Sequence, residues 1–445
     1  MDDRQQEKRE ARRRRRIRNQ VISYMAVMLL IAAGAAGVVF GVRQITEGRQ
    51  ASKDQQKGSQ AALNELLASE PELPTPPPES DPSAEATPEP APELTAKQKL
   101  DEIVNELIKV MPLEDKVANL FIVTPESITG VGTAVKAGEG TKDALTKYAV
   151  GGIVYAAKNI KSEAQFKEML ENTNLYTKYP IFLAVEEEGG KNSVVANAGI
   201  GTKVDAAKTI GQSGDTDAAY QAGVTLGTNL AGVGINLNLG PVADPAVTEN
   251  NWLGERSFGA DGALVGSMAG SVAQGLQSQD VTVCVKYFPG VGSTAEDPEK
   301  GLAGTERTEE QFRSEELPAF QAVIDSGADM IMVSSVAAPG LTGNNEPCVF
   351  SARVVTEILR EEMGFEGVII SDSLDMAAIS DYNGSEEAAI MALKAGCDML
   401  YMPEDFEKAY NGVLQAVRDG TISEERIDDA LRRIYRIKYA DKIEE

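Results

Sequence analysis

The sequence predicts an α/β fold of the (β/α)8, TIM-type barrel class, beginning near Thr95. Eight short apolar runs recur along the chain, at residues 119–124, 151–156, 180–185, 234–239, 281–287, 330–336, 367–371 and 398–402. Most are separated by stretches with helical periodicity, and several end in polar or acidic residues, which is typical of parallel strands buried between helices. Eight such units over roughly 350 residues fit one closed barrel better than a doubly wound sheet.

The first two regions of the chain predict a membrane anchor. Residues 1–20 contain the only dense basic run, and residues 21–42 carry no ionisable side chain except Tyr24. A helix of about 20 apolar residues crosses a bilayer, and the basic flank stays inside. We therefore expect a single-pass protein of the cell membrane, with a cytoplasmic basic head and everything after residue 42 extracytoplasmic. A cleaved signal peptide is the alternative, because residues 32–37 supply small side chains, but the long head and long apolar run favour an anchor.

Residues 43–94 form the third region, and their composition predicts a disordered, extended stalk. They are polar and then rich in Pro and Glu, with too few apolar side chains to fold. The barrel region, residues 95–445, begins where Thr95 and Gln98 have the spacing of a capping box before an apolar helical face.

Composition excludes several classes of function. The formal net charge is −25, so nucleic-acid binding is not expected as the main activity. The chain contains no histidine, which rules out histidine metal sites and imidazole catalysis. Its three cysteines, Cys284, Cys348 and Cys397, are widely spaced in apolar surroundings and predict buried free thiols. We expect no metal and no cofactor.

Polar residues at the ends of the predicted strands indicate a site. Glu186 begins an acidic triplet after the third run, Lys286 and Tyr287 end the fifth, Asp372 ends the seventh, and Arg256 lies in a Gly-flanked turn between the fourth and fifth. Barrel enzymes carry their chemistry where the strands end. The alternative is that Asp372 or Asp375 only caps the next helix, since Asp is a good N-cap residue.

Three motifs give the chain a resemblance to a known family. They are Gly-Glu-Arg-Ser-Phe-Gly at 254–259, Lys-Tyr-Phe-Pro-Gly-Val-Gly at 286–292, and Met-Gly-Phe-Glu-Gly at 363–367 running into Ser-Asp-Ser-Leu-Asp-Met at 371–376. Over residues 113–437 the chain resembles the family-three glycoside hydrolases, and among them the bacterial single-domain β-N-acetylglucosaminidases and β-N-acetylhexosaminidases. The resemblance implies that Asp372 is the catalytic nucleophile and that Arg256 and Lys286 bind the sugar in its first subsite.

The chain departs from the family pattern at the histidines and at one carboxylate. Glu186 replaces an aspartate, so any sugar binding there uses a longer arm, and Tyr287 and Ser335 stand where the family has histidines. The family's acid/base is an Asp–His pair, and the matching segment here contains Asp297 and Glu299. Glu299, with Asp297 as its partner, is the candidate acid/base if the loop closes and burial raises its pKa. The alternative is that these charges form only a solvated loop.

Two hypotheses follow for the function. The first is a membrane-anchored, extracytoplasmic β-N-acetylhexosaminidase acting on amino-sugar glycosides of the peptidoglycan type by a retaining mechanism. Such a mechanism needs a carboxylate nucleophile and a second group about 5–5.5 Å away. The second hypothesis is a catalytically impaired barrel that binds envelope glycan in a structural role, because loss of an acid costs turnover about 10²–10⁴-fold without preventing binding.

Overall fold

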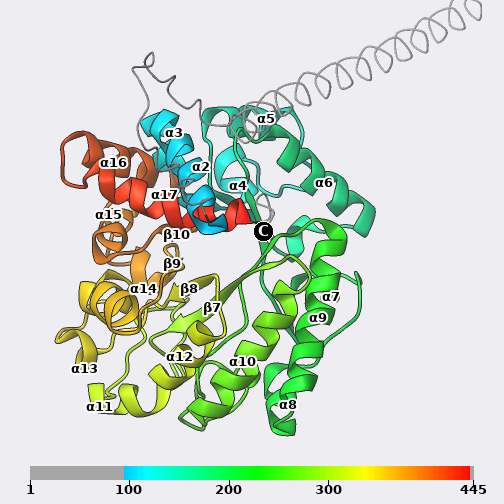
Figure 1. Ribbon diagram of the computed structural model, residues 1–445, viewed down its shortest axis with the longest axis vertical. Helices are drawn as coiled ribbons and strands as arrows, with labels where there is room; N and C mark the ends of the chain where they lie inside the picture. The colour runs from blue at the N-terminus through cyan, green and yellow to red at the C-terminus, as the bar shows by residue number, and fades with distance from the viewer. Residues whose placement is uncertain (1–94, 441–445) are drawn as a thin grey trace, which may run out of the picture. The chain divides into compact units, whose positions relative to one another are not determined.

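Eight parallel strands close into a barrel in the computed structural model, which describes residues 95–440 (Figure 1). In chain order they are β1 (Phe121–Val123), β2 (Gly152–Val154), β3 (Phe182–Val185), β6 (Leu237–Asn238), β7 (Thr282–Phe288), β8 (Met330–Val333), β9 (Val368–Ser373) and β10 (Met399–Tyr401). Around the barrel the order is β1-β10-β9-β8-β7-β6-β3-β2. Each strand lies within, or overlaps, one of the eight apolar runs, so the predicted fold class is confirmed.

The strands are buried because the barrel interior and the helical layer cover both of their faces. All four residues of β8 are buried, and Ile331 pairs with Ile369 of β9 in parallel register. Continuous β-branched and apolar sequence is what such strands require. β9 runs two residues beyond its predicted end, because Tyr401 of β10 pairs with Ser373 across a register shift. Asp372 therefore lies inside a strand.

Helices follow the strands and form the outer layer (Figure 1). They are α2 (Ala96–Val110), α3 (Leu113–Ala118), α4 (Pro125–Thr129), α5 (Glu139–Lys147), α6 (Glu163–Tyr176), α7 (Val194–Asn197), α8 (Ala207–Ser213), α9 (Thr216–Val233), α10 (Gly262–Gln277), α11 (Glu309–Gln311), α12 (Leu317–Asp325), α13 (Pro339–Thr342), α14 (Ala377–Ser380), α15 (Ser385–Ala395), α16 (Phe406–Arg418) and α17 (Glu424–Lys438). Short turns or irregular helices are η1 (Ala157–Asn159), η2 (Gly254–Arg256), η3 (Phe312–Glu316), η4 (Cys348–Phe350) and η5 (Arg353–Glu362). A small antiparallel hairpin, β4 (Glu187–Gly189) and β5 (Asn192–Ser193), follows β3.

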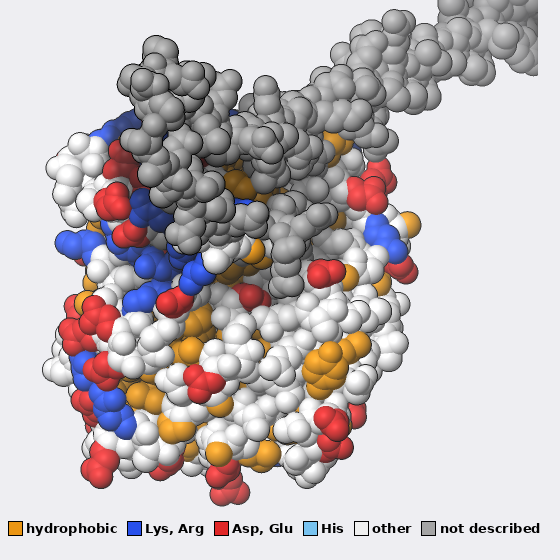
Figure 2. All heavy atoms as spheres, viewed as in Figure 1, with side chains coloured by type: hydrophobic (Ala, Val, Ile, Leu, Met, Phe, Trp, Pro, Cys, Tyr) orange, Lys and Arg blue, Asp and Glu red, His pale blue; other side chains and the backbone are white. Residues whose placement is uncertain are grey.

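The first and last described helices pack together at the amino end of the barrel. α2 starts with the expected capping box between Thr95 and Gln98. Nε of Arg436 in α17 lies 2.6 Å from Oδ1 of Asp101 in α2. Lys97 reaches Glu366, just before β9 starts, with 3.5 Å between charged atoms. Figure 2 shows Lys and Arg side chains gathered near α17, while Asp and Glu side chains dominate the lower rim of this face.

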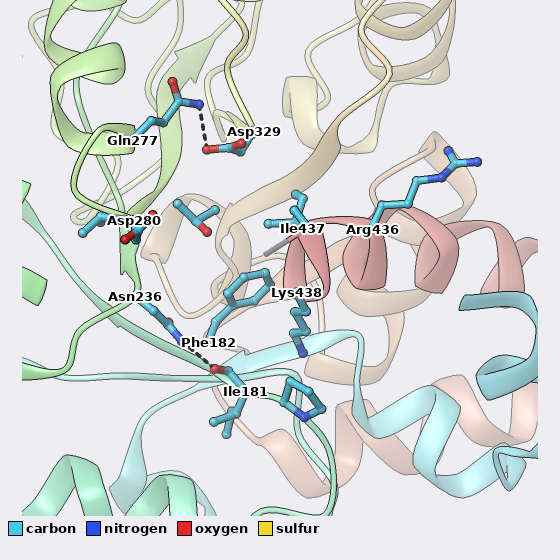
Figure 3. A pocket seen from close by; sticks show the side chains of 13 residues that line it. Ile181, Phe182, Asn236, Gln277, Asp280, Asp329, Arg436, Ile437 and Lys438 are labelled. Atoms are coloured by element: carbon cyan, nitrogen blue, oxygen red, sulfur yellow. Dashed lines mark hydrogen bonds between the residues drawn. The ribbon is translucent and has the colours of Figure 1, made fainter. Parts of the chain in front are cut away.

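A cavity of about 630 Å³ also lies at the amino end of the barrel (Figure 3). Several of its polar groups already serve the fold: Gln277 donates to Asp329 at 2.9 Å, and Asn236 donates to the carbonyl of Ile181 at 3.0 Å. Lys438 donates to the carbonyl of Gly151 at 2.9 Å, although burial lowers the pKa of its ammonium to about 7. The cavity is on the side away from the polar strand ends, and we assign it no chemistry.

The basic head, the predicted transmembrane helix at 21–42 and the stalk at 43–94 lie outside the described residues. Between residues 95 and 440, no helix is both long enough and apolar enough to span a bilayer. The cysteines Cys284, Cys348 and Cys397 are free and buried, as predicted.

Candidate active site

Of the three glutamates that follow β3, Glu187 stabilises the fold, and Glu186 and Glu188 belong to the candidate site. The carboxylate of Glu187 accepts the amide N–H groups of Val195 at 2.7 Å and Ala196 at 3.1 Å, so it fixes the start of α7. The hairpin then turns at Gly189, whose φ of 90° and close approach to the Asp205 carbonyl leave no room for a side chain. Glu186 and Glu188, on either side of Glu187, are directed to the cationic residues of the site.

Glu188 joins Arg256 and Lys286, the two residues for which the family resemblance implies a role in sugar binding. Its carboxylate accepts two hydrogen bonds from Arg256, at 2.8 and 2.7 Å, and one oxygen lies 2.8 Å from Nζ of Lys286. Burial alone raises the pKa of Glu188, but Lys286 and Arg256 more than offset this and lower it to about 2. The carboxylate therefore stays ionised and holds both cations in place.

Lys286 is fully buried in β7 and remains charged. Burial lowers the pKa of the ammonium, but Glu186 and Glu188 outweigh burial and raise it. Oε1 of Glu186 lies 3.5 Å from Nζ. Among the described residues Nζ makes no well-aligned hydrogen bond. The ammonium is therefore close to two carboxylates while its N–H groups remain able to donate hydrogen bonds.

Aromatic side chains cover the guanidinium of Arg256. It donates a hydrogen bond of 2.6 Å to the hydroxyl of Tyr287, and it lies 5.2 Å from the centre of that ring. On another side the centre of the Trp252 ring is 5.0 Å away. Cations are attracted to aromatic faces at such distances, so Arg256 is held by a carboxylate and by two rings.

Asp372 is the buried carboxyl group at the carboxyl end of β9, with 3% of the residue exposed. Its Oδ1 accepts the amide N–H of Ser373 at 2.8 Å. Burial raises the pKa of Asp372 to about 7, the Glu186 carboxylate adds to the rise, and the Ser373 amide and the Lys286 ammonium oppose it. Neither Asp372 nor Asp375 caps α14, whose cap residue is Met376 with no side-chain bond. The capping alternative is therefore wrong.

The loop at residues 290–307, which carries the candidate acid/base, is packed onto the barrel. Asp244 accepts the amide N–H groups of Val291 at 2.5 Å and Gly292 at 3.2 Å. Further along, Pro298 is buried and its carbonyl accepts the amide N–H of Ala378, in α14 just after β9. The loop thus passes over the strand ends and reaches the segment that follows Asp372.

Asp297 and Glu299 differ in how the loop holds them. The side chain of Asp297 is 24% exposed and lies 2.8 Å from Nζ of Lys300, which lowers its pKa. Asp297 also accepts the amide N–H of Glu299 at 3.0 Å. Glu299 is exposed, and neither carboxylate hydrogen-bonds to Asp372 within the described part of the chain. Glu299 therefore lacks, in this conformation, the burial on which its candidate role depends.

Four buried or half-buried residues of the site were missed from sequence: Glu188, Asp244, Trp252 and Tyr401. Tyr401 ends β10, and burial, then the charge of Glu186 and the nearby Tyr287 and Asp372, raise the pKa of its hydroxyl well above the ordinary value. A polar residue directly after apolar residues was the available signal for Asp244, whereas Glu188 follows Glu186 and Glu187 and has no signal of its own in the sequence. The serine pair at 334–335, where the family has a histidine, is buried, and neither hydroxyl has a partner in the described region.

A (β/α)8 barrel with a buried carboxyl at one strand end, facing a carboxylate-held Arg–Lys pair, has the architecture of a barrel glycoside hydrolase. The chain belongs to glycoside hydrolase family 3: residues 112–437 match the family described as "Glycosyl hydrolase family 3 N terminal domain". The resemblance seen in the motifs is thereby confirmed.

Individual relatives agree with this assignment. The chain is 30% identical over 266 residues to a "Beta-hexosaminidase" of Methylobacillus flagellatus, covering 58% of this chain and 75% of that protein. It is 32% identical over 292 residues to a "Beta-hexosaminidase" of Xylella fastidiosa, covering 63% and 84%. The solved structure of a family 3 β-N-acetylglucosaminidase from Paenibacillus sp. superposes with a TM-score of 0.70 at 29% identity, over 76% of this chain and 64% of that one. The match therefore spans less than two thirds of the Paenibacillus enzyme.

Proposed function

We propose that this protein is a β-N-acetylhexosaminidase-like glycoside hydrolase that cleaves amino-sugar glycosides with retention, with Asp372 as nucleophile. The observation that carries the proposal is the placement of buried Asp372 within electrostatic reach of Lys286, which Glu188 ties to Arg256. The names of the relatives support an amino-sugar substrate. Peptidoglycan-type glycans are the substrate class we favour.

The geometry supports a division of roles. Arg256 and Lys286 have donors suited to sugar hydroxyls, and Nζ of Lys286 has no well-aligned acceptor of its own in the described structure. Asp372, once ionised, attacks the anomeric carbon as the bond to the leaving oxygen breaks, which forms a glycosyl–enzyme ester; water then attacks the same carbon and releases Asp372. The loop carboxylates Asp297 and Glu299 are the candidates for handling the proton in both steps.

The test is hydrolysis of a chromogenic β-N-acetylglucosaminide by the full-length protein. We expect Asp372→Asn to reduce kcat by at least about 1,000-fold, and a fluorinated mechanism-based substrate to label Asp372 in the wild type. Asp280→Asn is the matched control, since Asp280 is an exposed carboxylate lining the cavity at the opposite end. Equal turnover by wild type and Asp372→Asn would contradict the proposal.

A glycan-binding barrel without turnover is the second candidate function. It is favoured by the Lys300 contact, which lowers the pKa of Asp297 and makes that group a poor proton donor, and by the exposed position of Glu299 outside the buried site. Such a protein binds an amino-sugar glycan but cleaves neither natural nor activated substrates and forms no Asp372 adduct. The labelling experiment above separates the two functions.

We also propose that the protein is anchored by residues 21–42, with the barrel outside the cell. The basic run before an uncharged apolar segment supports this orientation. Protease added to intact protoplasts should cut the stalk at 43–94 and release a fragment containing the barrel, which an antibody to the barrel would detect in the medium. A barrel that stays protected until the cells are lysed would refute the orientation.

A further inference from the structure

The loop at residues 290–307 starts beside two buried carboxyl groups, those of Asp244 and Glu316. Asp244 accepts two backbone N–H groups from the first residues of the loop. A Cβ at Gly290 would lie 3.3 Å from Oδ1 of Asp244 and 2.8 Å from Cγ of Glu316. Both acidic side chains therefore pack against the residue at which the loop starts.

Glu316 also holds the end of the loop, through Arg307. Nε of Arg307 lies 2.6 Å from Oε1 of Glu316, and Nη2 donates to Oε2 at 3.2 Å. The same Nη2 lies 2.7 Å from a carboxylate oxygen of Glu315. Only 13% of the Arg307 side chain and 1% of the Glu316 side chain are exposed. One buried carboxyl group is thus next to the start of the loop and binds its end.

Hydrogen bonds join the two ends of the loop to each other and to the barrel. The hydroxyl groups of Ser293 and Thr305 are 2.6 Å apart. The amide N–H of Thr305 donates at 2.9 Å to a carbonyl in the segment that follows β8. Residues 294–302, which carry both candidate proton-handling carboxylates, lie between these joined ends. Their position relative to Asp372 therefore depends on how the ends are held.

Stability alone does not explain why the pair of Arg307 and Glu316 is buried. Removing two charges from water costs free energy that their attraction only partly returns, and apolar side chains of similar volume often stabilise a fold as well. An arginine–carboxylate pair adds a defined geometry, because the guanidinium is a rigid, planar fork. Glu316 ends η3, a π-helical stretch, and such stretches are frequent at functional sites. The pair thus fixes the end of the loop relative to η3.

We propose that Arg307 and Glu316 are positioning residues, which hold the loop so that its carboxylates lie over the rim that carries Asp372. This inference rests on the proposed function, because the position of the loop matters for turnover only if the loop handles the proton. Misplacing a reacting group by about 1 Å can cost about 100-fold in rate. A weakened pair should therefore lower turnover without weakening the binding of sugar at Arg256 and Lys286.

The first test measures the loop itself, by amide hydrogen exchange of the full-length protein. Burial raises the pKa of Glu316 to about 7, against the opposing charge of Arg307, so measurements at pH 8 examine the ionised pair. Arg307→Met should speed exchange over residues 290–307 and leave β7 and β9 protected. The matched control is Arg313→Met, because Arg313 also pairs with two glutamates but has 42% of its side chain exposed. Loop exchange in Arg307→Met that equals the wild type would overturn the inference.

The second test compares two substrates at pH 8. On diacetylchitobiose we expect Arg307→Met to lower kcat about 10- to 100-fold with KM nearly unchanged. The loss should be smaller on an activated aryl glycoside, whose leaving group needs little protonation. Arg313→Met should behave as wild type on both. An equal loss on the two substrates would show a general structural defect and would overturn the positioning role.

Arg307→Lys decides the question if Arg307→Met does not fold. Lysine keeps the positive charge but lacks the planar fork, so loop exchange and kcat should lie between those of the wild type and those expected for Arg307→Met. A lysine variant with the loop exchange and kcat of the wild type would overturn the inference. Faster loop exchange in a protein whose wild type shows no turnover would reject the proposed function and keep the role of the pair in holding the loop. Turnover by the wild type together with unchanged loop exchange in the variants would reject the role of the pair alone.

Discussion

Two buried carboxyl groups of the site, Glu188 and Asp372, have pKa values displaced in opposite directions. Glu188 touches two cations, which outweigh burial and hold its pKa near 2. Asp372 has one amide N–H at hydrogen-bond distance and feels Lys286 from further away, so burial dominates and its pKa rises to about 7. Direct contact with a cation therefore decides which group is permanently charged and which can titrate.

A pH dependence follows from Asp372. In the proposed mechanism the attacking carboxylate, Asp372, must be ionised, and a raised pKa means that it is protonated below about pH 7. We expect kcat/KM to rise with pH through about 7. Because the Glu186 charge contributes to the raised pKa, Glu186→Gln should move this limb to lower pH, whatever it does to the maximum rate.

The pH–rate profile with an activated aryl glycoside measures this shift. The control is Glu255→Gln, an exposed carboxylate next to Arg256 in sequence that instead lies 3.7 Å from Lys191. A limb that stays in place, or moves to higher pH, in Glu186→Gln would show that the charge of Glu186 does not act on Asp372.

At this scale the sequence predicts residues that belong to recognisable motifs and misses those defined by contacts between distant segments. Arg256, Lys286 and Asp372 could be selected from motifs and strand ends. Glu188 could not be separated from its two neighbours, because only the hairpin geometry directs Glu187 to backbone amides. Trp252 meets Thr294 across two loops that carry no periodicity.

Among the elements, the strands were predictable and the hairpin and loop contacts were not. A strand buried on both faces needs a continuous apolar run, and such runs are visible in sequence. The strands of the β4–β5 hairpin are too short and too polar to give a periodic pattern in the sequence. The hairpin depends instead on the contacts of Glu187 and on glycines at its turn. The course of the loop at 290–307 depends on Asp244 and on the amide of Ala378, which lie far away along the chain.

Gly292 tests whether this loop conformation is needed. A Cβ at Gly292 would lie 1.8 Å from the carbonyl oxygen of Pro245, whereas a Cβ at Gly301 meets nothing within 4 Å. Gly292→Ala should lower the free energy of unfolding by about 1–3 kcal/mol and reduce turnover, because the backbone that Asp244 holds must shift. Gly301→Ala, in the same loop, should leave both unchanged. Thermal denaturation and turnover of the two variants make the comparison, and equal behaviour would mean that the loop adapts freely.

At the scale of the whole molecule, barrel closure could be predicted because eight strand-like runs alternate with helices. Closure brings the ends of β3, β7, β9 and β10 to one rim of the barrel. Residues more than two hundred positions apart in the sequence are close together only because of this closure. The placement of the candidate proton donors, Asp297 and Glu299, is not decided at this scale. It depends on where one loop, without secondary structure between 291 and 300, places two side chains.

The packing of α2 against α17 at the amino end of the barrel has a practical consequence for how the protein can be handled. Because Lys97 and Arg436 lie at the end opposite Asp372, a bead or sensor surface attached upstream of Thr95 leaves the rim that carries the site facing the solution. Protein captured in this way should hydrolyse a soluble substrate with the same kcat/KM as free protein.

The three cysteines are buried, so Lys300→Cys supplies one accessible thiol on the loop above the site. Capture through that thiol should block the hydrolysis of long glycans but not that of a small aryl glycoside. Equal activity on long glycans from both attachments would show that the active site is not at this rim.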